Sequence, residues 1–92
     1  MDPAEFATRL KQDGFQEIST RTFEPRPTND EHAHDCTVRG LVTAGEFVVM
    51  CDGVARTYRA GDIFEVAAGV THSETVGTGG ATLTTGRLYP AQ

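Results

Sequence analysis

The stretch HAHDCTVRGLVTAGEF, residues 32–47, opens with two histidines that a single alanine separates. If His32 and His34 begin a β-strand, both side chains leave the same face, about 7 Å apart along the backbone. Two imidazoles at that spacing can tilt onto one metal ion at bond lengths of roughly 2.0–2.1 Å. The other interpretation is a pair of solvated histidines in a loop rich in proline, asparagine and aspartate. The pair alone leaves both interpretations open.

The third and last histidine of the chain supports the metal-site interpretation. His72 directly follows the segment AAGVT, residues 67–71, which predicts a turn that returns the next strand across the sheet. A returning strand would carry His72 back toward the first two histidines. With this third residue, the sequence favours a shared metal site over three unrelated histidines.

Outward from the histidines, the chain alternates short strand-like segments with turn signals such as Asp52-Gly53. Six or seven short strands without a second helix predict an all-β fold, arranged as an antiparallel sandwich or barrel. The expected strands cover residues 15–23, 36–44, 46–51, 54–59, 63–67, 72–76 and 81–89.

The N-terminal segment, residues 1–14, predicts a short helix that Asp2 can cap. Phe6 and Leu10 fall on one face of this helix, and a helix so short must pack that face against another element. Residues 15–92 would then form the barrel. A chain of 92 residues predicts a single domain with a modest core.

The charge balance argues against nucleic-acid binding. The chain has 8 basic and 13 acidic residues, for a formal charge of −5, whereas phosphate binding relies on clustered cations. We find no signal-peptide pattern and no apolar run near the ~20 residues that span a bilayer, so we expect a cytoplasmic protein. Cys36 and Cys51 are expected to be free thiols, with one disulfide between them as the alternative.

Together, the histidine-bearing stretches resemble the two motifs of the cupin superfamily, in particular its small single-domain type-2 members. HAHDCTVRGLVTAGEF is similar to the first motif, G-x5-H-x-H-x3,4-E-x6-G, and GDIFEVAAGVTH, residues 61–72, to the second, G-x5-P-x-G-x2-H-x3-N. The resemblance covers about residues 23–89 and implies a double-stranded β-helix, a jelly-roll-like barrel. It also implies that His32, His34 and His72 bind a divalent metal ion, with Fe, Zn, Ni, Cu or Mn as candidates.

The chain departs from the family pattern at the one charged ligand. With Gly45 aligned to the closing glycine of the first motif, the family's glutamate falls on Val38. In the second motif, Ala67 stands in place of the proline and Val76 in place of the asparagine. Three neutral ligands would leave a centre of net charge +2 with positions open to water or substrate.

Four further residues are candidates for the surroundings of the metal. Cys36 would share an inward face with His34 as a fourth ligand or a nearby thiol, although a small buried cysteine commonly only fills space. Glu74 could replace the missing carboxylate, or point to solvent beyond the end of its strand. Arg39 and Arg87 could hold an anionic substrate, or lie solvated at the surface.

These observations favour a small metal-binding protein. The first hypothesis is a mononuclear metal enzyme of oxygenase or isomerase type that acts on a small polar molecule. The alternatives are a non-catalytic module that binds a small ligand or a metal, and a structural homo-oligomer with a vestigial site. We also predict a homodimer, whose apolar contact surface would consist of Phe6, Leu10, Phe15 and Ile18.

Overall fold

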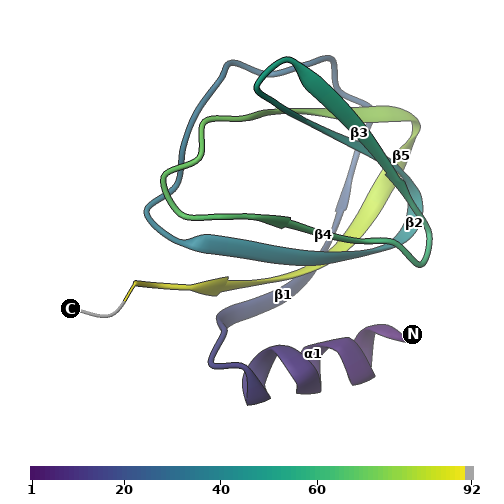
Figure 1. Ribbon diagram of the computed structural model, residues 1–92. Helices are drawn as coiled ribbons and strands as arrows, with labels where there is room; N and C mark the ends of the chain where they lie inside the picture. Colours follow the sequence, from purple (N-terminus) through teal and green to yellow (C-terminus); the bar gives the residue numbers. More distant parts are fainter. Residues whose placement is uncertain (91–92) are drawn as a thin grey trace.

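The computed structural model describes residues 1–90 and contains one helix and five strands that curve into a barrel (Figure 1). All strand pairs are antiparallel, and the sheet has the order β1-β5-β2-β3, with β4 also paired to β2. The predicted all-β barrel with a short N-terminal helix is confirmed. Residues 91–92, which the predicted barrel included, lie outside the described residues. The elements are α1 (Pro3–Gln12), β1 (Gln16–Phe23), β2 (Thr37–Cys51), β3 (Val54–Arg59), β4 (Ile63–Val66) and β5 (Ser73–Leu88).

Two strands are much longer than the sequence predicts. β2 continues through Gly45, and β5 continues through residues 77–80, where turns were expected. Gly45 has a φ of +78°, and a side chain there would overlap the backbone carbonyl of Gly80. The β2–β5 register shifts on either side of this contact, so both strands bend there without ending. The prediction of six or seven short strands is therefore wrong, because these glycines bend the strands and do not stop them.

The interior of the barrel holds the larger of two apolar clusters. The rings of Phe47 and Phe64 lie 5.0 Å apart between centroids, and Tyr58 packs on Phe64 at 5.7 Å. Gly40 on β2 faces Phe64 on β4 in the strand register, and its lack of a side chain makes room for that ring. The cluster consists of Val42, Phe47, Val49, Phe64, Val66, Val76, Ala81 and Leu83.

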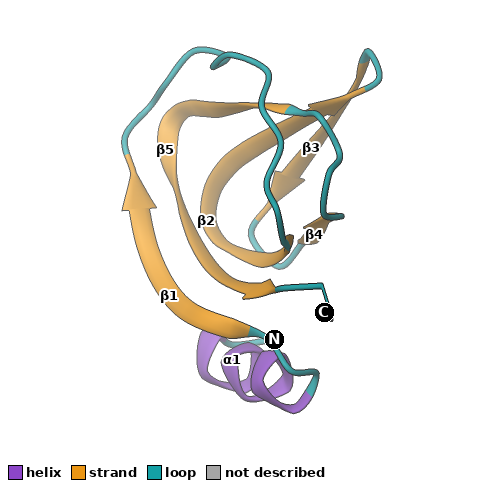
Figure 2. Cartoon of the chain, turned by 90° about the vertical axis from the view of Figure 1, so that its left-hand side faces the viewer, coloured by secondary structure: helices purple, strands orange, loops and turns teal. Residues whose placement is uncertain are grey.

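Helix α1 lies below the barrel, beside β1 (Figure 2), and contributes Phe6 and Leu10 to the second apolar cluster. Asp2 caps the helix as expected, because its side chain accepts a hydrogen bond of 2.8 Å from the backbone N–H of Glu5. Phe6 and Leu10, only 3% and 1% exposed, pack against Leu41 of β2. The helix thus covers the outer face of the sheet opposite the barrel interior.

This packing corrects the predicted dimer surface. Phe6, Leu10 and Phe15 are buried within the chain, and Ile18 is partly buried against them, so these residues stabilise the helix–sheet contact. A homodimer stays a prediction that needs a different contact surface. No helix within residues 1–90 combines the length and apolar character needed to cross a bilayer.

Candidate metal centre

The segment between β1 and β2 brings His32 beside His72. This segment runs antiparallel to the start of β5 and meets it at two isolated backbone bridges, Arg26 with Val76 and His32 with His72. The backbone N–H of each histidine donates a 2.9 Å hydrogen bond to the carbonyl of the other. The two histidines are therefore direct cross-strand neighbours.

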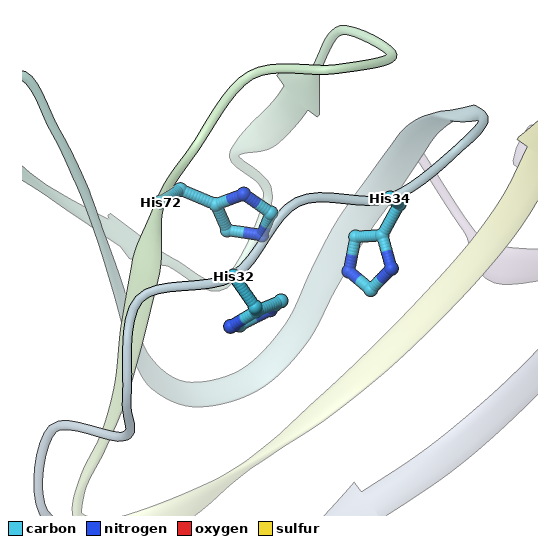
Figure 3. Close-up of side chains that lie close together, drawn as sticks. All are labelled: His32, His34 and His72. Atoms are coloured by element: carbon cyan, nitrogen blue, oxygen red, sulfur yellow. The ribbon is translucent and has the colours of Figure 1, made fainter.

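The three imidazoles lie close together (Figure 3). Their ring centroids are 5.0 Å apart for His32 and His34, 4.4 Å for His32 and His72, and 5.3 Å for His34 and His72. One nitrogen from each ring lies within 4.8 Å of the other two. The predicted three-histidine cluster exists, but His32 and His34 lie in the loop before β2 and not on a regular strand.

Backbone carbonyls orient two of the rings. The Nδ1 atom of His32 lies 2.9 Å from the carbonyl oxygen of Asp30, and that of His72 lies 3.0 Å from the carbonyl oxygen of Val70. Because a carbonyl only accepts, each Nδ1 carries a proton, and in the neutral ring each Nε2 then keeps a free lone pair. This is the arrangement in which a histidine is prepared to bind a metal through Nε2.

Glu74 lies beside both of these lone pairs. Its Oε1 is 3.5 Å from Nε2 of His32, and its Oε2 is 3.9 Å from Nε2 of His72. Asn29 holds the residue in place, because its Oδ1 accepts from the Glu74 backbone N–H at 2.7 Å and its Nδ2 donates to Oε1 at 3.3 Å. Of the two interpretations of Glu74, the structure supports the one that places the carboxylate at the histidines.

The environment of His34 favours its neutral form. Burial lowers the pKa of His34 below its usual value of 6.5. Repulsion from His32 and His72, when these rings are protonated, and from the charged Arg87 lowers it further. The nearby carboxylate of Glu74 acts in the opposite direction without reversing the shift. A neutral imidazole is the form that binds metal ions.

A hollow of about 260 Å³ opens next to the histidines. One part of its wall is polar, one part is apolar and one part is basic. The polar residues are Asn29, His32, His34, Glu74 and Thr85; the apolar ones are Phe23, Val38, Phe47, Phe64 and Leu83; the basic ones are Arg21, Arg26 and Arg87.

Among the predicted neighbours of the site, Val38 and Arg87 lie in this hollow. They are register partners on β2 and β5, so both side chains face inward. Cys36 is buried beside Arg87, with 4.0 Å between its Sγ and the guanidinium Nη1. Cys36 and Cys51 are both free thiols. The buried position of Cys36 agrees with a packing role.

Arg39 lies on the other face of β2 and does not line the hollow. Its Nε donates to Glu65 at 2.6 Å and its Nη1 to Asp13 at 2.8 Å, while the guanidinium stacks 4.5 Å above the ring of Phe15. The hydrogen bond to Glu65 raises the pKa of Arg39, which stays charged. The expected substrate role of Arg39 is thereby corrected, since neighbouring strand residues face opposite sides.

The sequence did not indicate several residues of the hollow, and Asn29, Arg21 and Arg26 are the ones that bear on its chemistry. Asn29 stands in a proline-rich loop, where no spacing rule links it to Glu74. Arg21 and Arg26 precede the first motif. The side that Arg21 faces depends on the β1–β5 pairing, and the position of Arg26 depends on its isolated bridge with Val76. The alternation of Arg21 with Phe23 was the one available signal, because residues two apart on a strand share a face.

Comparisons with solved structures connect this architecture to known proteins. An RmlC-like cupin from Shewanella frigidimarina is 28% identical, with a TM-score of 0.67 over 82% of this chain and 67% of its own. A cupin superfamily protein from Desulfitobacterium hafniense is 22% identical, with a TM-score of 0.68 over 79% of this chain and 66% of its own. This chain therefore spans about two thirds of the length of both relatives.

A third structure matches nearly end to end. A cupin-2 domain containing protein from Shewanella frigidimarina is 14% identical, with a TM-score of 0.67 over 90% of this chain and 91% of its own. At such identity the likeness is one of fold. No protein-family model and no curated protein matches the sequence.

Proposed function

This chain has the cupin fold, and from that premise we propose that residues 1–92 form one domain that binds one divalent metal ion. The ligands would be His32, His34 and His72. The observation that carries the proposal is the shared orientation of His32 and His72, whose Nδ1 protons are held by backbone carbonyls while both Nε2 lone pairs stay free.

The spacing of the donor atoms fits a metal ion after a small contraction. Two ligands bound at about 2.1 Å in tetrahedral geometry lie roughly 3.4 Å apart. The histidine nitrogens lie within 4.8 Å of one another, so each would move inward by roughly 0.8 Å or less to reach that geometry. Rotation of the imidazoles can supply such a displacement without moving the barrel.

Glu74 would add a fourth ligand, and an ion with five or six ligands would keep positions open toward the hollow. Its oxygens are already 3.5 Å and 3.9 Å from the Nε2 atoms of His32 and His72, close to the separation of two ligands on one ion. In this arrangement the carboxylate comes from β5, two residues after His72, and replaces the glutamate that the family pattern places at Val38. Three imidazoles and a carboxylate suit Fe, Zn, Ni, Cu and Mn alike, and softness alone does not select among them.

A bound ion would face the hollow, where it would supply Lewis acidity to a small molecule. The chain's own residues would bind and orient that molecule against the apolar wall. We therefore propose a mononuclear metal centre that acts on a small polar ligand.

Calorimetric titration of protein purified without a histidine tag tests this proposal. Metal-free protein should bind Zn²⁺ or Ni²⁺ at one ion per chain, and His34→Ala should weaken the affinity about a hundredfold or more. Asp35→Ala serves as the control, because Asp35 is an exposed neighbour in the same loop. Absence of saturable binding, or equal affinity in wild type and His34→Ala, would contradict the proposal.

A further inference from the structure

Three of the chain's eight basic residues gather at one hollow. Arg21 of β1, Arg26 of the following segment and Arg87 of β5 all line the space next to the histidines. The chain as a whole has a formal charge of −5, so a cluster of three arginines is contrary to its overall acidic charge. Among the residues that line the hollow, Glu74 is the single carboxylate.

Strand register places two of these arginines on the inward face. Arg21 pairs with Leu83, and Arg87 pairs with Val38, and both partners line the hollow. Within residues 1–90, none of the three arginines forms a salt bridge. Arginines elsewhere on the molecule that do have carboxylate partners are Arg9, Arg39 and Arg59.

We propose that the hollow binds a small dicarboxylic acid. One carboxylate would lie at the metal on the histidine side, and the other would pair with Arg21 and Arg87. The carbon chain between them would contact the apolar wall around Phe23 and Phe64. The metal-side half of this inference rests on the proposed metal centre, whereas the arginine half does not.

The chemistry of the wall selects this class of ligand. A guanidinium presents a planar pair of N–H donors that matches a carboxylate, and hydrogen bonds between charged groups are about twice as strong as neutral ones. A volume of about 260 Å³ equals that of roughly nine water molecules, which matches a short organic acid. The apolar wall favours a carbon backbone over a compact inorganic anion.

Titration with malonate tests the inference, with malonamide as the neutral analogue of the same shape and inorganic phosphate as the compact anion. Malonate should bind metal-free protein weakly and Zn²⁺-loaded protein more tightly, and malonamide and phosphate should bind less well than malonate to both forms. Arg87→Gln should weaken malonate binding about tenfold or more. Arg21→Gln should do the same, and because Arg21 is exposed this variant tests the site even if Arg87→Gln fails to fold.

Arg56→Gln is the matched control, because Arg56 is an exposed arginine on β3 that does not line the hollow. Equal malonate binding in wild type and both hollow variants, or malonate no better than malonamide or phosphate, would overturn the inference. Zn²⁺ binding without malonate binding would overturn it while leaving the metal centre in place. Arginine-dependent malonate binding without Zn²⁺ binding would support the arginine half of the inference and overturn the metal centre.

Discussion

Replacing Gly40 by alanine should destabilise the barrel, because the structure leaves no space for a methyl group there. A Cβ at this buried position would lie 2.5 Å from Cε1 of Phe64, closer still to its Cζ, and 3.1 Å from Cγ2 of Thr85. Carbon atoms in contact are normally about 3.5–4.0 Å apart, so the Phe64 ring would have to retreat by about 1 Å. Phe47 and Tyr58 also pack against that ring, with centroids 5.0 Å and 5.7 Å from it.

Inserting a methyl group into a packed core costs about 1–3 kcal/mol. In a domain of this size each kcal/mol lowers the Tm by about 4–8 °C, so the expected decrease is about 4–24 °C. Thermal unfolding of the metal-free protein, followed by circular dichroism and checked by urea denaturation, measures both quantities. Gly79→Ala is the control, because a Cβ at Gly79 meets nothing within 4 Å and its φ is compatible with alanine.

A second substitution tests the assigned cause. Trimming the ring with Phe64→Leu should restore part of the stability in the Gly40→Ala background, so the two changes should not be additive. A Tm for Gly40→Ala equal to that of wild type, or full additivity of the two substitutions, would refute the packing argument.

Three other changes test the site. Glu74→Gln keeps the shape of the side chain but removes its charge, and should weaken metal binding about 10–100-fold, as measured by calorimetry; unchanged affinity would remove Glu74 from the ligand set. In the Glu74→Gln background, Val38→Glu should recover much of the lost metal affinity, because it supplies a carboxylate inside the hollow. No recovery would mean that position 38 does not face the ion. The lowered pKa of His34 means that the unfolded chain takes up a proton before the folded chain does, so the unfolding free energy of metal-free protein should decrease as the pH falls below about 6.5. Urea denaturation at pH 7.5 and 5.5 should show this decrease, and His34→Asn should reduce it; an equal decrease in both proteins would contradict the assignment.

The barrel and the histidine cluster were predictable because each depends on local signals. Turn residues such as Asp52-Gly53 mark real strand ends, and the hairpin between β2 and β3 forms where that signal stands. The spacing of His32, His34 and His72 predicted that their imidazoles lie close together. Gly45 was misread as a strand end, because a glycine that ends a strand and one that bends it look the same in sequence.

The surroundings of the cluster depend on contacts that sequence spacing does not encode. Arg39 and Arg87 looked equivalent, yet strand register turns Arg87 into the hollow and Arg39 toward Asp13 at the end of α1. Glu74 reaches the histidines because Asn29, 45 residues earlier in the chain, holds it from the neighbouring segment. Pairings between distant segments decide both outcomes, and a single sequence carries no direct record of them.

The two isolated bridges that hold the loop before β2 have a kinetic consequence. His72 directly precedes the 16-residue strand β5, which pairs with both β1 and β2. His32 and His34 instead belong to a loop that a few backbone hydrogen bonds attach to the barrel. Segments with few protected amides open locally at a lower free energy than the whole fold. Amide hydrogen exchange should therefore be fast across residues 24–36 and slow along β5. An ion at the histidines would enter and leave by opening of this loop while the barrel stays folded, so its residence time would follow local opening and not global unfolding.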